Sequence, residues 1–274
     1  MTRRAVAFAC GSARLWGMVD SAGHHGGTGL LIVSGGNEIR AGAFAGQAQL
    51  AAWLAEDAGV PVFRFDRRGV GDSEGENTGW HGSRDDIAAA IAAFRGAVPG
   101  LRRVVAYGVC DAAAALMLHA PDLHGPNLQG LDGLVLANPW TFDDDAADSA
   151  GGHSPGALRR RYWAKLTNPQ ELWRLVRGQV DLRRLLGGLA QAARPREAAT
   201  PIVATLHEAL MRGEAPATVL ISAGDRVGQR FLAVWPAGDP RVQVHPGASH
   251  SFMDDPDTAA WLYQRLVEAT ASRH

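Results

Sequence analysis

The stretch RRVVAYGVCDAAAALML, residues 102–118, predicts a strand, a sharp turn and a helix in immediate succession. Its β-branched beginning is typical of a buried strand, and its Ala- and Leu-rich end is typical of an apolar helix. Gly108, Ala112 and Ala113 are small, so the strand and the helix can pack closely around the turn. We therefore expect the turn to present Cys110 at the C-terminal edge of a parallel sheet.

Short β-branched runs and longer helical patterns alternate on both sides of this stretch. The predicted strands are Val6–Cys10, Leu15–Asp20, Leu30–Ser34, Pro61–Phe65, Arg103–Tyr107, Leu131–Ala137, Thr218–Ser222 and Val242–His245. The predicted helices are Ala43–Ala58, Arg84–Ala97, Asp111–Leu118, Val227–Val234 and Pro256–Arg273. The first two strands read as an antiparallel hairpin, and the alternation after them predicts an α/β fold, a mostly parallel sheet with helices on both faces.

Residues 139–215 contain amphipathic helical patterns but no convincing strand. We expect them to form a helical cap inserted into a core made of residues 1–138 and 216–274. Within the cap, residues 159–197 carry nine arginines and one lysine against three carboxylates, a net charge of about +7. Such a surface can attract an anionic substrate or acyl carrier, or it can be an ordinary solvated helix face.

The composition is that of a soluble globular protein. The chain has 274 residues, of which 46% are hydrophobic and 20% charged, and its net charge is −1. These values exclude a disordered, collagen-like or coiled-coil chain, and the near-neutral charge argues against nucleic-acid binding. Because there is no dinucleotide fingerprint, no Walker A sequence and no set of histidines with metal-ligand spacing, we expect no cofactor and no metal.

Cysteine usage and hydropathy indicate the cytoplasm. Two cysteines in a chain of this length do not make a disulfide framework, which favours a reducing compartment. The N-terminal residues lack the apolar core of a signal peptide. The long apolar stretch 104–120 is interrupted by Gly108 and Asp111, which favours a strand and a helix over a membrane span.

Cys110, Asp225 and His250 are the predicted catalytic triad. A cysteine at a helix N-terminus beside a histidine forms a thiolate readily and can attack a carbonyl carbon. Asp225 follows the strand TVLIS and His250 follows the strand VQVH, in the chain order nucleophile, acid, histidine. Asp239 and Asp254 are the alternatives for the acid, but neither follows a strand directly. The alternative for Cys110 is an inert buried cysteine.

The segment GDSEG, residues 71–75, also matches the G-x-S-x-G pattern of a serine nucleophile. It begins several residues after its strand, and a polar, glycine-rich segment follows it instead of a helix. We therefore expect that Ser73 is not the nucleophile.

The predicted oxyanion hole uses the loop Ser34-Gly35-Gly36-Asn37 and the turn after Cys110. An oxyanion hole needs two backbone N–H donors, and the Asp111 amide directly follows the nucleophile. The two glycines let the loop approach a substrate, so Gly36 or Asn37 is the expected second donor, with a plain turn as the alternative. We expect the Asp111 side chain to point away from Cys110, because its charge would oppose thiolate formation.

Together these motifs resemble the α/β-hydrolase superfamily over nearly the whole chain, including DRRGVGDSEG at 66–75, which looks like that superfamily's Asp-x-Arg-Gly-x-Gly-x-Ser loop. A finer resemblance is to hydrolase 1 of the exosortase A system-associated family, encoded near bacterial exopolysaccharide genes. It is carried by YGVCDAA at 107–113, NPW at 138–140, RRRYWAKL at 159–166 and GASHSF at 247–252. This resemblance implies a Cys-His-Asp hydrolase, with Cys110, His250 and Asp225 in these roles. A cysteine in this turn also resembles dienelactone hydrolases and polyhydroxyalkanoate synthases, although Ala112 stands where many members have glycine.

Three functions follow from this reading. The first is a hydrolase that cleaves a small carboxylic ester or thioester through an acyl-cysteine intermediate. The second is an acyltransferase, since the intermediate stays activated and the basic cap could bind coenzyme A or an acyl-carrier protein. The third is a non-catalytic binding protein on the same fold, with an unreactive thiol.

Overall fold

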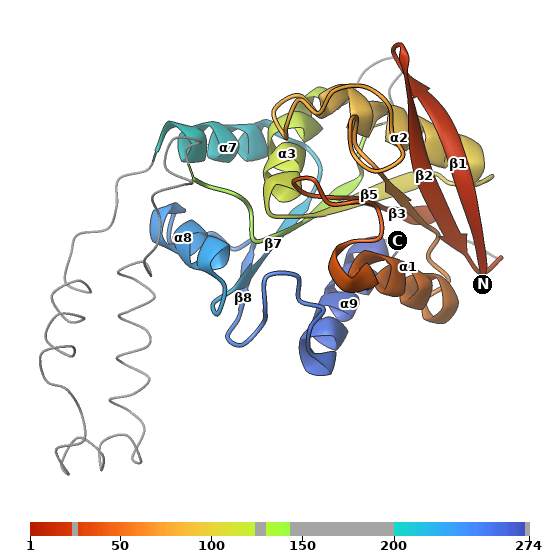
Figure 1. Cartoon of the computed structure of the whole chain (residues 1–274). Coiled ribbons are helices and arrows are strands. Elements are labelled where there is room, and N and C mark those ends of the chain that lie inside the picture. The colour runs from red at the N-terminus through yellow and green to blue at the C-terminus, as the bar shows by residue number, and fades with distance from the viewer. Residues whose placement is uncertain (24–26, 124–129, 143–199, 272–274) are drawn as a thin grey trace, which may run out of the picture.

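The computed structural model describes residues 1–23, 27–123, 130–142 and 200–271. Within them, eight strands form one sheet in the order β1-β2-β4-β3-β5-β6-β7-β8 (Figure 1). The strands are β1 (Thr2–Cys10), β2 (Ala13–Ser21), β3 (Thr28–Val33), β4 (Val62–Phe65), β5 (Arg103–Val109), β6 (Gly133–Ala137), β7 (Ala217–Ser222) and β8 (Val242–His245). Strand β2 runs antiparallel to both β1 and β4, and the other neighbours are parallel.

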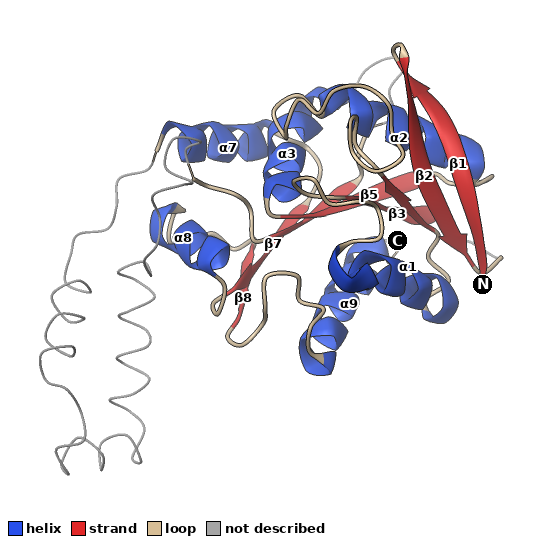
Figure 2. Cartoon of the chain, in the orientation of Figure 1, coloured by secondary structure: helices blue, strands red, loops and turns tan. Residues whose placement is uncertain are grey.

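Helices cover both faces of the sheet (Figure 2). The described helices are η1 (Ala43–Ala45), α1 (Gly46–Asp57), α2 (Arg84–Ala97), α3 (Asp111–His119), η2 (Ala120–Leu123), α7 (Pro201–Arg212), α8 (Arg226–Val234) and α9 (Pro256–Thr270). Helices α1 and α9 lie on one side, and α2, α3 and α7 lie on the other (Figure 1).

Strand β3 shows why both faces must be covered. All six of its residues are buried, and its side chains alternate between the faces. Leu31 and Val33 join the hydrophobic cluster under α2 and α3, whereas Leu30 and Ile32 join the cluster under α1 and α9. Burial of each such side chain contributes roughly 1.5–3 kcal/mol, which makes this strand pattern a strong determinant of the layered fold.

Helix α2 has the residue spacing of a helix that packs on a sheet. Ile87, Ala90, Ile91 and Phe94 occupy positions i, i+3, i+4 and i+7 of one helix face, and all four are buried. Asp85 and Asp86 lie in its first turn and Arg95 in its last, which complements the helix dipole.

The predicted mostly parallel sheet with helices on both faces is confirmed. One helix differs from its prediction, since residues 43–45 form a 3₁₀ turn and the α-helix begins at Gly46. Phe44 and Ala45 have φ values of 50° and 58°, a left-handed backbone that no local pattern of apolar residues indicates.

The predicted cap stays a prediction, because residues 143–199 and the basic stretch 159–197 lie outside the described residues. At its C-terminal end, within the predicted cap range, α7 packs Val203, Leu206 and Leu210 into the cluster around α3. In the described part of the chain, no helix is long and apolar enough to cross a membrane.

Candidate active site

Cys110 occupies the turn between β5 and α3 in a strained backbone conformation. Its φ is 61° and its ψ is −123°, a combination that costs a residue with a side chain about 1–3 kcal/mol. The Cys110 N–H donates to the Ala137 carbonyl at 3.0 Å, and the Cys110 carbonyl accepts from Trp140 at 3.1 Å and from Ala114 at 3.2 Å. These bonds to β6, to the segment after it and to α3 hold the strained turn, and the Cys110 side chain stays partly exposed.

Gly108 makes this turn possible. A Cβ atom at Gly108 would lie 2.9 Å from the carbonyl carbon of Ala112 and 3.0 Å from the Ala113 nitrogen. Both are backbone atoms of α3 that cannot move aside, so only glycine allows strand and helix to approach this closely.

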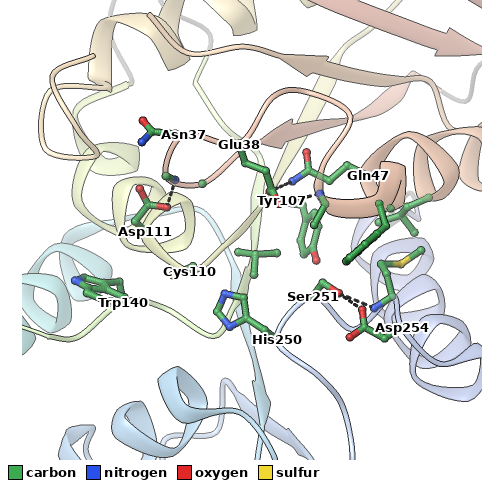
Figure 3. A pocket seen from close by; sticks show the side chains of 18 of the residues that line it. Asn37, Glu38, Gln47, Tyr107, Cys110, Asp111, Trp140, His250, Ser251 and Asp254 are labelled. Atoms are coloured by element: carbon green, nitrogen blue, oxygen red, sulfur yellow. Dashed lines mark hydrogen bonds between the residues drawn. The ribbon is translucent and has the colours of Figure 1, made fainter. Parts of the chain in front are cut away.

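Asp225 and His250 meet at the C-terminal edge of the sheet. Asp225 follows β7 and is the N-cap of α8, where its Oδ2 accepts from the amides of Val227 at 2.9 Å and Gly228 at 3.1 Å. The same Oδ2 atom lies 3.0 Å from Nδ1 of His250, in the loop after β8. In Figure 3 the His250 ring lies beside Cys110.

These contacts change the ionisation of both groups. Hydrogen bonds with Asp225 and with Cys110 raise the pKa of His250 to about 10, although partial burial opposes the shift. Burial acts to raise the pKa of Asp225, but the hydrogen bond and charge of His250 and the two amides outweigh it and lower the pKa. Near neutral pH the pair is therefore an imidazolium held by a carboxylate.

Asn138 supports the histidine loop, a role that sequence reasoning missed. This fully buried residue has a φ of 43°. Its side chain donates to the His250 carbonyl at 3.0 Å and accepts from the Ser222 N–H at 2.8 Å. The Ser222 hydroxyl in turn donates to the Ala248 carbonyl. Asn138 opens the NPW motif at the end of a strand, but nothing in that motif indicates that its side chain holds the histidine loop.

The loop after β3 lies against the start of α3. This is expected because α3 follows β5, and β3 and β5 are neighbours in the sheet. The amide of Gly36 donates to Oδ1 of Asp111 at 2.7 Å, and Arg67 donates to Oδ2 of Asp111 at 3.1 Å. The Asp111 carboxylate thus faces the loop rather than the nucleophile (Figure 3). Of the three predicted oxyanion donors, Gly36 is engaged by this side chain. Among the described residues the Asn37 N–H has no partner, and the Asp111 N–H belongs to a first helical turn.

The alternative site residues have other partners. Ser73 is buried, and its hydroxyl donates to the Asp66 carbonyl at 2.8 Å and accepts from the Trp16 N–H at 2.9 Å. Asp239 is paired with Arg241 at 2.7 Å, which lowers its pKa. Asp254 accepts a hydrogen bond from Ser251 at 2.8 Å. None of these three is hydrogen-bonded to His250.

A cavity of about 730 Å³ opens above Cys110 and His250. Its apolar walls include Leu50, Tyr107, Trp140 and Met253, and Glu38 lies at its edge. The volume falls within the range of small-molecule sites. In the described ranges no group of three or more His, Cys, Asp or Glu side chains is arranged to hold a metal ion.

Comparisons with known proteins agree with this architecture. Residues 24–260 match the sequence profile of the Alpha/beta hydrolase family. A proline iminopeptidase from Mycobacterium smegmatis shares 19% identity with a TM-score of 0.57, over 97% of this chain and 99% of that chain. A Pyrococcus furiosus esterase shares 16% with a TM-score of 0.61, over 98% and 92%.

A third solved structure is Est1E from Butyrivibrio proteoclasticus with ferulic acid bound. It shares 13% identity with a TM-score of 0.56, over 97% of this chain and 100% of that chain. No curated protein matches the sequence. At these identities the solved structures establish the fold alone.

Proposed function

The chain belongs to the alpha/beta hydrolase family, and from this premise we propose that it hydrolyses a small carboxylic ester or thioester through an acyl-cysteine intermediate on Cys110. The observation that carries the proposal is the 3.0 Å bond between Asp225 and His250, next to a cysteine in a strained, partly exposed turn. This arrangement supports the assignment of Cys110 as nucleophile, His250 as base and Asp225 as orienting acid.

In the first half of the reaction, the Cys110 thiolate attacks the carbonyl carbon of the substrate. A C–S bond forms while the carbonyl electron pair moves to the oxygen, where backbone amides stabilise the charge. The pair returns, the bond to the leaving group breaks, and the His250 imidazolium gives its proton to the departing alcohol or thiol. The products of this half are an acyl-cysteine, a neutral His250 and the free leaving group.

In the second half, His250 takes a proton from water, and the hydroxide adds to the acyl carbon. The C–S bond then breaks, which releases the carboxylic acid and restores the thiolate and the imidazolium. Asp225 keeps Nδ1 of His250 directed toward itself, so that Nε2 faces the reacting atoms. We assign the oxyanion contacts to the amides of Asn37 and Asp111, and Gly36 shapes the loop that carries Asn37.

The cavity supports a small organic substrate with an apolar part. Its walls of Leu50, Trp80, Tyr107 and Met253 favour an alkyl or aryl group over a strongly hydrated one. The esterase and peptidase named among the solved structures use the same fold, which is consistent with acyl chemistry at this sheet edge.

We further propose that this hydrolase serves a bacterial exopolysaccharide or exosortase system in the cytoplasm. The support is the resemblance of YGVCDAA, NPW and GASHSF to hydrolase 1 of the exosortase A system-associated family. An anionic acyl carrier would then be the partner of the basic stretch 159–197.

The test is intact-mass spectrometry of wild type, Cys110→Ala and Cys10→Ala after incubation with p-nitrophenyl esters, acyl thioesters or iodoacetamide. We expect turnover and a single adduct in wild type and in Cys10→Ala, and neither in Cys110→Ala. Cys10 is the matched control because it is the other cysteine and lies 6% exposed, outside the cavity.

Other results would change the assignment. Turnover that survives in Cys110→Ala would refute the acyl-cysteine. Release of acid into water supports the hydrolase, whereas transfer to an added alcohol in preference to water would replace it with an acyltransferase. An unlabelled and inactive wild type would leave a binding protein.

A further inference from the structure

We propose that Asp111 and Arg67 are positioning residues that clamp the loop after β3, so that the N–H of Asn37 serves as the second oxyanion donor. The inference rests on the proposed acyl-cysteine mechanism and concerns how its oxyanion hole is held. It also accounts for a carboxylate directly beside the nucleophile, where an unpaired negative charge would oppose a thiolate.

The clamp holds Gly36 from both sides. The Gly36 N–H donates to Oδ1 of Asp111 at 2.7 Å, and the Gly36 carbonyl accepts from Nη2 of Arg67 at 2.6 Å. The same Nη2 atom donates to Oδ2 of Asp111 at 3.1 Å. Three bonds therefore join the loop, the first residue of α3 and the loop after β4 into one unit.

The peptide bond between Gly36 and Asn37 lets the clamp on Gly36 fix the direction of the Asn37 N–H. The Gly36 carbonyl and the Asn37 N–H belong to one planar trans peptide, in which they point in opposite directions. Arg67 is only 3% exposed, so the carbonyl that it binds points into the protein. The Asn37 N–H must then point outward, and both Gly36 and Asn37 line the cavity above Cys110.

Glycine makes room for the carboxylate. A Cβ atom at Gly35 would lie 2.5 Å from Oδ1 of Asp111, so a side chain there would expel it. Gly36 has a φ of 52°, which suits glycine. The Asn37 side chain turns away from His250 (Figure 3). It accepts a hydrogen bond from Asn77 at 2.8 Å, which leaves the Asn37 backbone N–H to face the cavity.

Arg67 also balances the charge of Asp111. Its side chain is 3% exposed and that of Asp111 16%, so the ion pair is poorly screened by water. In the segment that resembles the Asp-x-Arg-Gly-x-Gly-x-Ser loop, Arg67 stands at the variable position and Arg68 is the motif arginine, so the motif itself did not single out Arg67. Nothing local in the sequence indicates that its partner is Asp111, 44 residues away.

The experiment compares two reactions of Cys110 in the full-length protein. Ester hydrolysis develops an oxyanion, whereas alkylation by iodoacetamide needs a reactive thiolate but no oxyanion hole. For Asp111→Ala we expect kcat for p-nitrophenyl butyrate to fall about 10- to 100-fold, with KM and the alkylation rate within about threefold of wild type. Arg67→Met should lower kcat by a similar factor, and because it leaves the Asp111 charge unpaired it should also slow alkylation, but by less than it lowers kcat.

Conservative variants separate positioning from general damage to the fold. Asp111→Asn keeps an oxygen for the Gly36 N–H, and Arg67→Lys keeps a positive charge and a nitrogen donor, so each should recover part of the lost kcat. Hydrogen–deuterium exchange of a peptide containing residues 35–37 gives a readout without turnover. It should be slower in wild type than in Asp111→Ala.

Three outcomes would overturn the clamp. A normal kcat in Asp111→Ala would show that the loop needs no support, and a higher kcat would show that the carboxylate blocks the hole. An alkylation rate that falls as far as kcat would place the effect on the thiolate instead. A wild type without ester turnover would refute the proposed function itself, and with it the donor role of Asn37, which distinguishes that failure from these three.

Discussion

Cys10 and Cys110 have the same side chain in opposite surroundings. Cys10 ends β1 and is 6% exposed, and its Sγ donates to Asp86 at 3.4 Å and accepts from Arg68 at 3.0 Å. Burial, with the hydrogen bond and charge of Asp86, raises the pKa of Cys10 despite the opposing effect of Arg68. Cys110 is partly exposed at a helix N-terminus and interacts with His250. Position in the fold, rather than the thiol, separates an inert residue from a candidate nucleophile.

The largest expected difference between the two cysteines is their rate of alkylation. In the native protein, iodoacetamide should modify Cys110 at least about a thousandfold faster than Cys10, because Cys10 reacts only when the hairpin opens. In concentrated urea the two rates should converge. Peptide mapping after timed labelling measures the alkylation rates of both cysteines. Comparable rates for Cys10 and Cys110 in the native protein would contradict the expected difference in reactivity.

Asp225→Asn should remove the carboxylate that orients His250, the base that acts beside Cys110. We expect kcat to fall about 10²- to 10⁴-fold. The pKa of His250 should move down from about 10 toward its ordinary value, because the bond to Asp225 is its largest cause. Asparagine is also a good N-cap, so α8 should stay folded. A pH–rate profile measures the shift, with Asp239→Asn as the control that should leave the profile unchanged.

His250, beside Cys110, and the buried Cys10 should change the free energy of unfolding in different pH ranges. His250 keeps its proton up to about pH 10 in the folded protein but only to about 6.5 when unfolded. Its stabilising effect is therefore complete below pH 6.5 and is lost as pH rises to about 10. The raised pKa of Cys10 acts in the same direction, but only above its ordinary value of 9.0.

Thermal unfolding from pH 6 to 10 tests this difference. The Tm of wild type minus that of His250→Asn should decrease steadily above pH 6.5. Only wild type loses the stabilisation that comes from the raised pKa of His250. Parallel curves for the two proteins would contradict the raised pKa of His250.

The smallest expected effect concerns backbone strain. Cys110→Gly should be more stable than Cys110→Ala by about 1 kcal/mol, because glycine tolerates a φ of 61°. At Cys10, the last residue of β1, the order should reverse, since glycine weakens strands. Urea unfolding of the four variants measures both differences. Equal stabilities at position 110 would mean that the turn carries no strain.

Local patterns predicted most of the sheet and the order of the site residues. Helix α2 and strand β8 begin and end where the apolar spacing and the flanking polar residues indicate. The turn at Cys110 was readable because its glycine, its cysteine and its small residues are all local. The 3₁₀ turn before α1 was not, because left-handed Phe44 and Ala45 have no propensity signal in the chain.

The sequence by itself determined a layered α/β chain and which residues follow its strands, because periodicity and turn chemistry act over a few neighbouring residues. Only the tertiary structure decided that Asn138 supports His250 and that Asp111 takes the Gly36 amide, contacts that span 112 and 75 residues. Sheet packing brings together loops that are far apart in the sequence. A shift of a few tenths of an ångström in their positions decides which groups reach hydrogen-bond distance. No local pattern of residues contains that information.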